Sequence, residues 1–184
     1  MKKQKTITAL VPKGVETILD IGSEGNLYSG GKWIVTTIDV VGNPTVTQDL
    51  NNNQKLPFPD NSFDMVVANQ ILEHLGNVEE IVSEIKRVSK KYMFIGLPNE
   101  INWKGRIKLL IGRPDWEGYL PFHHKNFFTV KTIEDFIIKF FGTYQKKEYW
   151  EPSSQWWFPE FANKFLKNMW PAMFCKEVFY LISK

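Results

Sequence analysis

The sequence predicts an α/β protein built on a mainly parallel β-sheet. Apolar segments of strand length recur through residues 16–98, and a glycine, a proline or a polar residue ends each of the clearest ones. Between two of these segments, residues 78–88 carry apolar side chains at helical spacing. Because strands separated by crossover helices pair in parallel, this alternation favours a mainly parallel sheet.

The strands of the first half follow in order along the chain. We predict five of them, at residues 16–22, 32–39, 45–47, 63–68 and 92–98. The first ends in a glycine turn, the second in Asp39, and the fifth at Pro98. A helix follows the fourth strand, and Asn77 with Glu80 predicts a capping box at its start.

The second half is less regular. Helices are predicted at residues 101–111, 133–141 and 159–170, and strands at residues 143–150 and 177–183. Thr129 or Thr132 opens the second of these helices and Gly142 ends it. We expect one domain over residues 1–184. Fewer than twenty residues precede the first strand, so the long connection 99–128 is expected to form a substrate lid with the aromatic segment 152–171.

Composition limits the kind of protein. The chain has 184 residues, 43 % of them apolar, which is enough for a real core and argues against global disorder. Its net charge of +3 implies no polyanionic partner. A single cysteine, Cys175, excludes an internal disulfide and fits a reducing compartment. Residues 6–11 are too short and too polar for a signal peptide, and no segment is long enough to cross a bilayer. We therefore expect a cytoplasmic protein.

The most informative segment is Leu56–Leu75, with the sequence LPFPDNSFDMVVANQILEHL. Its prolines, Asp60 and Asn61 form a turn that neither a helix nor a strand can continue through. The apolar strand at 63–68 then ends in Asn69 and Gln70. Open α/β sheets bind their ligands at this end of a strand.

This segment resembles the centre of the class I S-adenosylmethionine (SAM)-dependent methyltransferases of the type 11 family, and the similarity extends over about residues 16–142. The resemblance implies a Rossmann-like, seven-stranded, mostly parallel sheet with helices on both faces and an antiparallel last strand. It also implies SAM as the methyl donor and S-adenosylhomocysteine as the product.

The resemblance also implies where the cofactor binds. The loop after the first strand, DIGSEGN, supplies Asp20, Gly22, Ser23 and Gly25, although Glu24 and Asn26 stand where the family usually has glycine. Asp20 would lie near the amino group of the cofactor, or serve as a structural turn acid.

The remaining cofactor contacts follow later strands. Asp39, with Val40, would bind the ribose hydroxyls, since a strand-end acid can accept from both. Asp49 and Leu50 would contact the adenine, with a surface-loop role for Asp49 equally open. Asn69 and Gln70 would border the cofactor and the methyl acceptor.

Three histidines are candidates for a general base: His74, His123 and His124. The family similarity places His74 in its Glu-His pair and the other two before its next helix; each could instead hydrogen-bond loop backbone. We expect no metal, because two adjacent histidines without a spaced set of carboxylates or cysteines do not match known ligand spacings.

The acceptor is expected to be a small molecule, a glycan or a lipid-linked compound, because the lid segments combine aromatic and basic residues. Those residues could also serve only lid packing. Transient contact with a membrane surface is compatible with them, and nucleic acid is not expected. The alternative is a methyltransferase-like binding or assembly protein that has lost catalysis. A nicotinamide-dependent oxidoreductase ranks below both, because the Gly-x-Gly-x-x-Gly fingerprint is absent.

Overall fold

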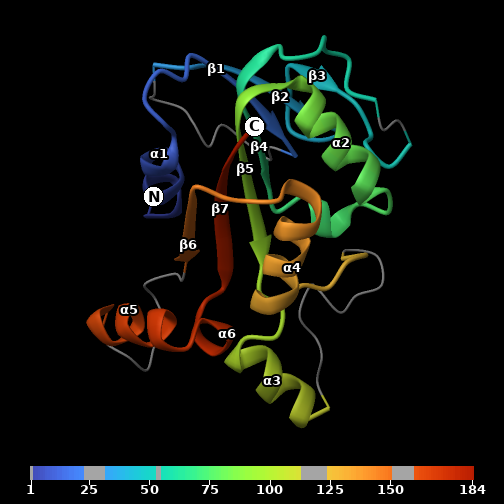
Figure 1. Cartoon of the computed structure of the whole chain (residues 1–184). Coiled ribbons are helices and arrows are strands. Elements are labelled where there is room, and N and C mark those ends of the chain that lie inside the picture. The colour runs from blue at the N-terminus through green and yellow to red at the C-terminus, as the bar shows by residue number, and fades with distance from the viewer. Residues whose placement is uncertain (1, 23–31, 53–54, 113–123, 151–159) are drawn as a thin grey trace.

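The computed structural model describes residues 2–22, 32–52, 55–112, 124–150 and 160–184. Within these residues, seven strands form one sheet in the order β3-β2-β1-β4-β5-β7-β6 (Figure 1). Their bounds are β1 Thr17–Ile21, β2 Ile34–Asp39, β3 Val46–Thr47, β4 Phe63–Asn69, β5 Ser89–Pro98, β6 Lys146–Trp150 and β7 Glu177–Ser183. Neighbours from β3 to β5 pair in parallel, and β7 runs antiparallel to both β5 and β6. The predicted seven-stranded, mostly parallel sheet is confirmed.

Helices cover the sheet and its lower edge. The helical elements are α1 Lys2–Leu10, the 3-10 turn η1 Leu72–His74, α2 Val78–Val88, α3 Trp103–Leu110, α4 Val130–Phe141, α5 Glu160–Met169 and α6 Pro171–Phe174. In Figure 1, α1 lies on one side of the sheet and α2 and α4 on the other. Helices α3, α5 and α6 lie beyond the carboxyl end of β5, at the bottom of the view.

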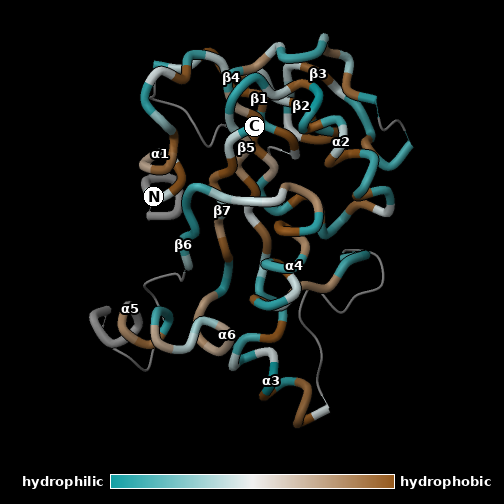
Figure 2. The backbone as a smooth tube through the Cα atoms, viewed as in Figure 1, coloured by the Kyte–Doolittle hydropathy of each residue, from teal (hydrophilic) through white to brown (hydrophobic). Residues whose placement is uncertain are grey.

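Two apolar layers form the core, one on each face of the sheet. Alternate strand residues such as Leu19, Val66 and Ile95 pack with the apolar sides of α2 and α4. Their neighbours Ile18 and Met65 face the other way, toward Ile7 and Leu10 of α1. In Figure 2 the central strands are accordingly hydrophobic along most of their length. Strands covered on both faces carry continuous apolar segments, which is why the sequence located them.

Two helices and one cap differ from the sequence prediction. Helices α1 and α6 were not predicted. Asn77 precedes α2 but makes no capping hydrogen bond with its side chain; instead its Nδ2 donates to the carbonyl of Leu50 at 2.9 Å. The capping-box prediction at Asn77 is therefore wrong. At α4, Thr129 and Thr132 do form a reciprocal capping box, so both predicted residues take part.

No helix in the described parts of the chain is both long and apolar enough to cross a membrane.

Arg87 fixes the proline turn that leads into β4. Its guanidinium donates to the carbonyls of Leu56 and Phe58, at 3.0 and 2.8 Å. It also pairs with Glu84 at 2.6 Å and Asp60 at 2.7 Å. The hydrogen bond from Arg87 is the largest cause that holds the pKa of Glu84 below its usual value of 4.5.

Replacing Arg87 with alanine is expected to lower the free energy of unfolding by about 2 kcal/mol, since charge-assisted bonds to two carbonyls and two carboxylates disappear from a partly exposed site. Because the pKa of Glu84 is lowered on folding, its contribution is complete above pH 4.5 and is lost as the pH falls through the lowered value. Urea denaturation between pH 3 and 7 measures both effects.

Lys131→Ala provides the matched control, because the Lys131–Asp135 pair is exposed on α4. Its stability is expected to stay within about 0.5 kcal/mol of the parent protein. An Arg87→Ala protein as stable as this control, with an unchanged acid profile, would contradict the role of Arg87.

Candidate functional site

The candidate site lies at the carboxyl ends of β1, β2 and β4. The chain leaves β1 toward β2 and β3 on one side, and then crosses to β4 on the other side of β1. Such a reversal of strand order leaves a crevice outside the carboxyl ends, where open α/β sheets bind ligands. Asp20, Asp39 and Asn69 come from the ends of the three strands. The structure therefore brings these predicted site residues to one edge.

Gly22 closes the end of β1 against the loop after β4. Its φ of +73° is a conformation that side chains rarely adopt, and a Cβ there would lie 2.6 Å from the side chain of Ile71. Its N–H donates to the carbonyl of Ile38 at 2.9 Å. Glycine is thus required here for close packing, beyond any approach to a cofactor. Asp20, two residues earlier, is buried. Ser23 and Gly25 lie outside the described residues.

Asp39 ends β2 with a half-buried carboxylate. Its Oδ1 accepts from the backbone N–H groups of Val40 and Val41, at 2.6 and 3.2 Å, which fixes the side chain against its own turn. Within the described chain, Oδ2 accepts no hydrogen bond, so one oxygen of Asp39 is available to a ligand hydroxyl. The side chain of Val40 is exposed.

Asp49 and Leu50 follow β3 and play supporting roles in the structure. Both oxygens of Asp49 are engaged: Oδ1 accepts from the N–H of Asn51 at 2.9 Å, and Oδ2 from the side chain of Asn52 at 2.6 Å. Leu50 is buried in the core. An adenine contact by Asp49 would have to share these oxygens.

Asn69 lies at the end of β4 with a nearly buried side chain. Its Oδ1 has no hydrogen-bond partner among the described residues, which is costly for a buried polar atom and typical of a ligand-binding position. A Cβ at Gly96, its partner on β5, would lie 2.2 Å from that oxygen, so only glycine leaves room for the amide. Gln70 has a φ of +55°, and its N–H donates to the carbonyl of Gly96 at 2.9 Å.

Two of the three predicted histidines meet next to this edge. The rings of His74 and His124 lie 4.6 Å apart, edge to face. Nδ1 of His124 lies 2.6 Å from Oε1 of Glu100, and Glu73 lies beside both rings. We call Glu73, His74, Glu100 and His124 the histidine–glutamate cluster. His123 is outside the described residues.

Backbone and side-chain bonds fix the segment that carries His124. The N–H groups of Lys125 and Asn126 both donate to the carbonyl of Glu73, at 2.7 and 3.0 Å. The side chain of Asn126 donates to the carbonyls of Leu72 and Leu75. The segment after residue 123 is thus attached to η1, and His124 is held in place.

Glu100 is the site residue that sequence reasoning missed. It follows β5 by two residues and is buried, and its N–H donates to the carbonyl of Phe128 at 2.9 Å. An acid just past the last residue of a predicted parallel strand was the available signal. Its partner His124 lies 24 positions further along the chain, so no local spacing linked the two.

Comparison with known proteins identifies the architecture. Residues 35–94 match the type 11 methyltransferase domain family. Over these 60 of its 184 residues, the chain is similar to a methyltransferase domain. The matched residues run from β2 to β5 and include Asp39, Asn69 and the first half of the histidine–glutamate cluster.

Individual proteins are also similar to parts or all of this chain. A stretch of 41 residues is 49 % identical to an uncharacterized methyltransferase of Schizosaccharomyces pombe, and it spans 22 % of this chain and 15 % of that protein. A SAM-dependent methyltransferase of Archaeoglobus fulgidus has the same fold, with a TM-score of 0.66 at 19 % identity over 100 % of this chain and 93 % of that one. Phosphoethanolamine N-methyltransferase 2 of Haemonchus contortus, solved with SAM, gives 0.59 at 16 % identity over 100 % and 52 %.

Proposed function

We propose that this protein transfers a methyl group from SAM to an acceptor that is a small molecule, a glycan or a lipid-linked compound. The observation that carries the proposal is Asp39, a half-buried carboxylate at a strand end. One of its oxygens accepts from its own turn, and the other accepts no hydrogen bond from the described residues. In this family's fold, the neighbouring crevice between β1 and β4 would hold the remainder of the cofactor.

The chain's own residues supply binding and alignment. Oδ2 of Asp39 would accept from a ribose hydroxyl, and the buried amide oxygen of Asn69 would accept from a donor on the cofactor or the acceptor. Methyl transfer from a sulfonium is an in-line displacement, so holding the donor and acceptor close and aligned provides most of the rate. A base is needed only where the acceptor must lose a proton.

The acceptor class rests on the surface around the lower edge of the sheet. Helix α3 exposes Ile107 and Leu110 beside basic residues, and the end of this helix is coloured hydrophobic in Figure 2. Helix α5 and the residue after it expose Phe165, Met169 and Trp170. An apolar surface with basic residues suits a lipid-linked acceptor at an anionic membrane surface.

Isothermal titration of the purified protein with SAM and S-adenosylhomocysteine tests the proposal. We expect both to bind with one-to-one stoichiometry. A second assay measures the transfer of labelled methyl groups to three acceptors: free sugars, lipid-linked sugars in vesicles and nucleic acid. We expect the label on the lipid-linked sugars. If neither nucleotide binds at millimolar concentration, the enzyme proposal is wrong and a binding or assembly role replaces it.

A further inference from the structure

We propose that the histidine–glutamate cluster binds a divalent transition metal, with Glu73, His74 and His124 as its ligands. One potential ligand atom from each of the three side chains lies within 4.8 Å of the other two. Glu73 is buried and both histidines are partly buried, so these groups are not a chance gathering of surface charges.

The donor atoms select the kind of metal. Two imidazoles and one carboxylate form the protein ligand set of many catalytic zinc sites, which keep a further coordination position open. Imidazole nitrogens favour zinc and its transition-metal neighbours over magnesium, which prefers oxygen ligands. The sequence predicts no metal because His123 and His124 are adjacent and lack a spaced set of carboxylates. In the structure His124 instead lies beside His74, and Glu73 and Glu100 supply carboxylates.

Glu100 prepares His124 for this role. With its carboxylate 2.6 Å from Nδ1, the ring carries its proton on Nδ1, and Nε2 is left as the basic nitrogen. A histidine that binds a metal through one nitrogen commonly donates its other N–H to a carboxylate, which fixes the ring and raises its basicity. Glu100 is therefore a positioning residue for the site.

The ligands are also held from both sides before any metal binds. His74 and Glu73 belong to η1, and the bonds from Lys125 and Asn126 to the carbonyl of Glu73 attach the His124 segment to that turn. The neighbouring ammonium group of Lys125 is engaged by Asn51 at 2.7 Å. Ligand atoms around zinc lie about 3.4 Å apart when each bond is about 2.1 Å. The ligand atoms therefore need to approach one another by at most about 1.4 Å, which rotation about the side-chain χ angles provides.

The site also narrows the acceptor, a step that rests on the proposed function. The cluster follows β4 and β5 at the same edge as Asn69, which is proposed to border the methyl acceptor, so a metal there would lie at the edge where the acceptor binds. A hydroxyl oxygen bound to the metal would have a lowered pKa and release its proton to water. That oxygen forms the new bond to the methyl carbon, and the electron pair of the broken C–S bond returns to sulfur. The acceptor class is therefore a hydroxyl compound.

Titration of tag-free, chelator-treated protein with Zn²⁺ and Mn²⁺, with Mg²⁺ for comparison, tests the site. We expect one equivalent of Zn²⁺ to bind, and we expect Mg²⁺ to bind more weakly than Zn²⁺. His74→Ala and His124→Ala should each weaken Zn²⁺ binding at least 100-fold. Glu100→Gln should weaken it about 10- to 100-fold, as loss of an outer partner does. Glu148→Gln, which changes a partly exposed acid on β6, should bind as the parent protein does.

Circular dichroism and thermal melts keep the result interpretable if a variant folds poorly. A metal that binds only the folded parent protein must raise its melting temperature, whatever the variants do. Absence of saturable one-to-one binding by the parent protein, or unchanged binding by both histidine variants, would overturn the inference. SAM titrations on the same samples separate the two proposals: SAM binding without metal binding removes only the metal site, and the reverse result removes only the cofactor proposal.

Discussion

Asp39→Asn is expected to weaken SAM binding about 100-fold. The asparagine keeps an oxygen that can accept from the N–H groups of Val40 and Val41, so the turn after β2 should survive. What it loses is the negative charge and the second acceptor oxygen. A hydrogen bond to a charged group contributes roughly 1.5–3 kcal/mol, and a 100-fold change in affinity corresponds to about 2.7 kcal/mol. Isothermal titration with SAM and S-adenosylhomocysteine measures the change.

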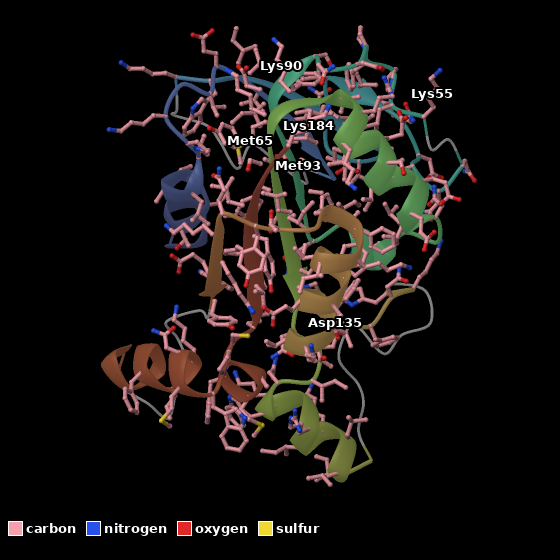
Figure 3. All side chains as sticks on the ribbon, viewed as in Figure 1. Lys55, Met65, Lys90, Met93, Asp135 and Lys184 are labelled. Atoms are coloured by element: carbon pink, nitrogen blue, oxygen red, sulfur yellow. The ribbon has the colours of Figure 1, made fainter. Side chains whose placement is uncertain are left out.

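Asp135→Asn is the matched control for this experiment. Asp135 lies exposed on α4 (Figure 3), where its carboxylate pairs with Lys131 at 2.7 Å. We expect this variant to bind SAM as the parent protein does, and both variants to melt at the temperature of the parent protein without ligand. Equal SAM affinity in the Asp39→Asn and parent proteins would show that the ribose is held elsewhere.

Gly96→Ala is expected to cause the largest loss of stability, about 2–3 kcal/mol. The added Cβ would lie 2.2 Å from Oδ1 of Asn69 and 3.1 Å from the ring of Phe179, both in the interior. Either the amide must leave its place at the end of β4 or β5 must shift against β7, and overpacking of this kind typically costs about 1–3 kcal/mol. For a chain of this size, the melting temperature should fall by roughly 5–10 °C.

Gly76→Ala controls for the loss of a flexible residue. A Cβ at Gly76 would meet nothing closer than the ammonium nitrogen of Lys125 at 3.5 Å, an ordinary contact, and its φ is not positive. Its melting temperature should stay near that of the parent protein. Because the methyl group added at position 96 displaces Asn69, SAM binding by the Gly96→Ala protein should weaken as well. The Gly76→Ala protein should retain the SAM affinity of the parent protein. A Gly96→Ala protein as stable as this control would mean that β4 and β5 adapt without cost.

The sheet could be predicted from the sequence because its strands are buried on both faces. Residues 63–69 are all buried, which produces a continuous apolar segment that periodicity detects. Helix α1 could not be predicted, because among its described side chains only Ile7 and Leu10 are buried and the rest carries no apolar pattern. The prediction of a capped α2 failed at Asn77 because a tertiary bond to Leu50 competes with the local cap.

The candidate site was predictable in part for the same reason. Asp39 and Asn69 stand at strand ends, and the carboxyl ends of parallel strands meet at one edge. The partnership of Glu100 with His124 depends on a long connection folding back, and the position of His124 depends on the contacts that Lys125 and Asn126 make with Glu73. Long-range pairings of this kind leave no mark in local spacing.

The placement of β7 between β5 and β6 has a consequence for biosynthesis. A ribosome releases β6 well before β7, yet β7 is the only strand that pairs with β6 among the residues that the structure describes. During that interval the nascent polypeptide presents β5 as an open, apolar border with unpaired amides, the kind of border that recruits other chains. Chaperones that shield the open edge of β5 therefore matter most just before β7 emerges from the ribosome. Strand β7 lies between β5 and β6 in the sheet but is synthesised after both.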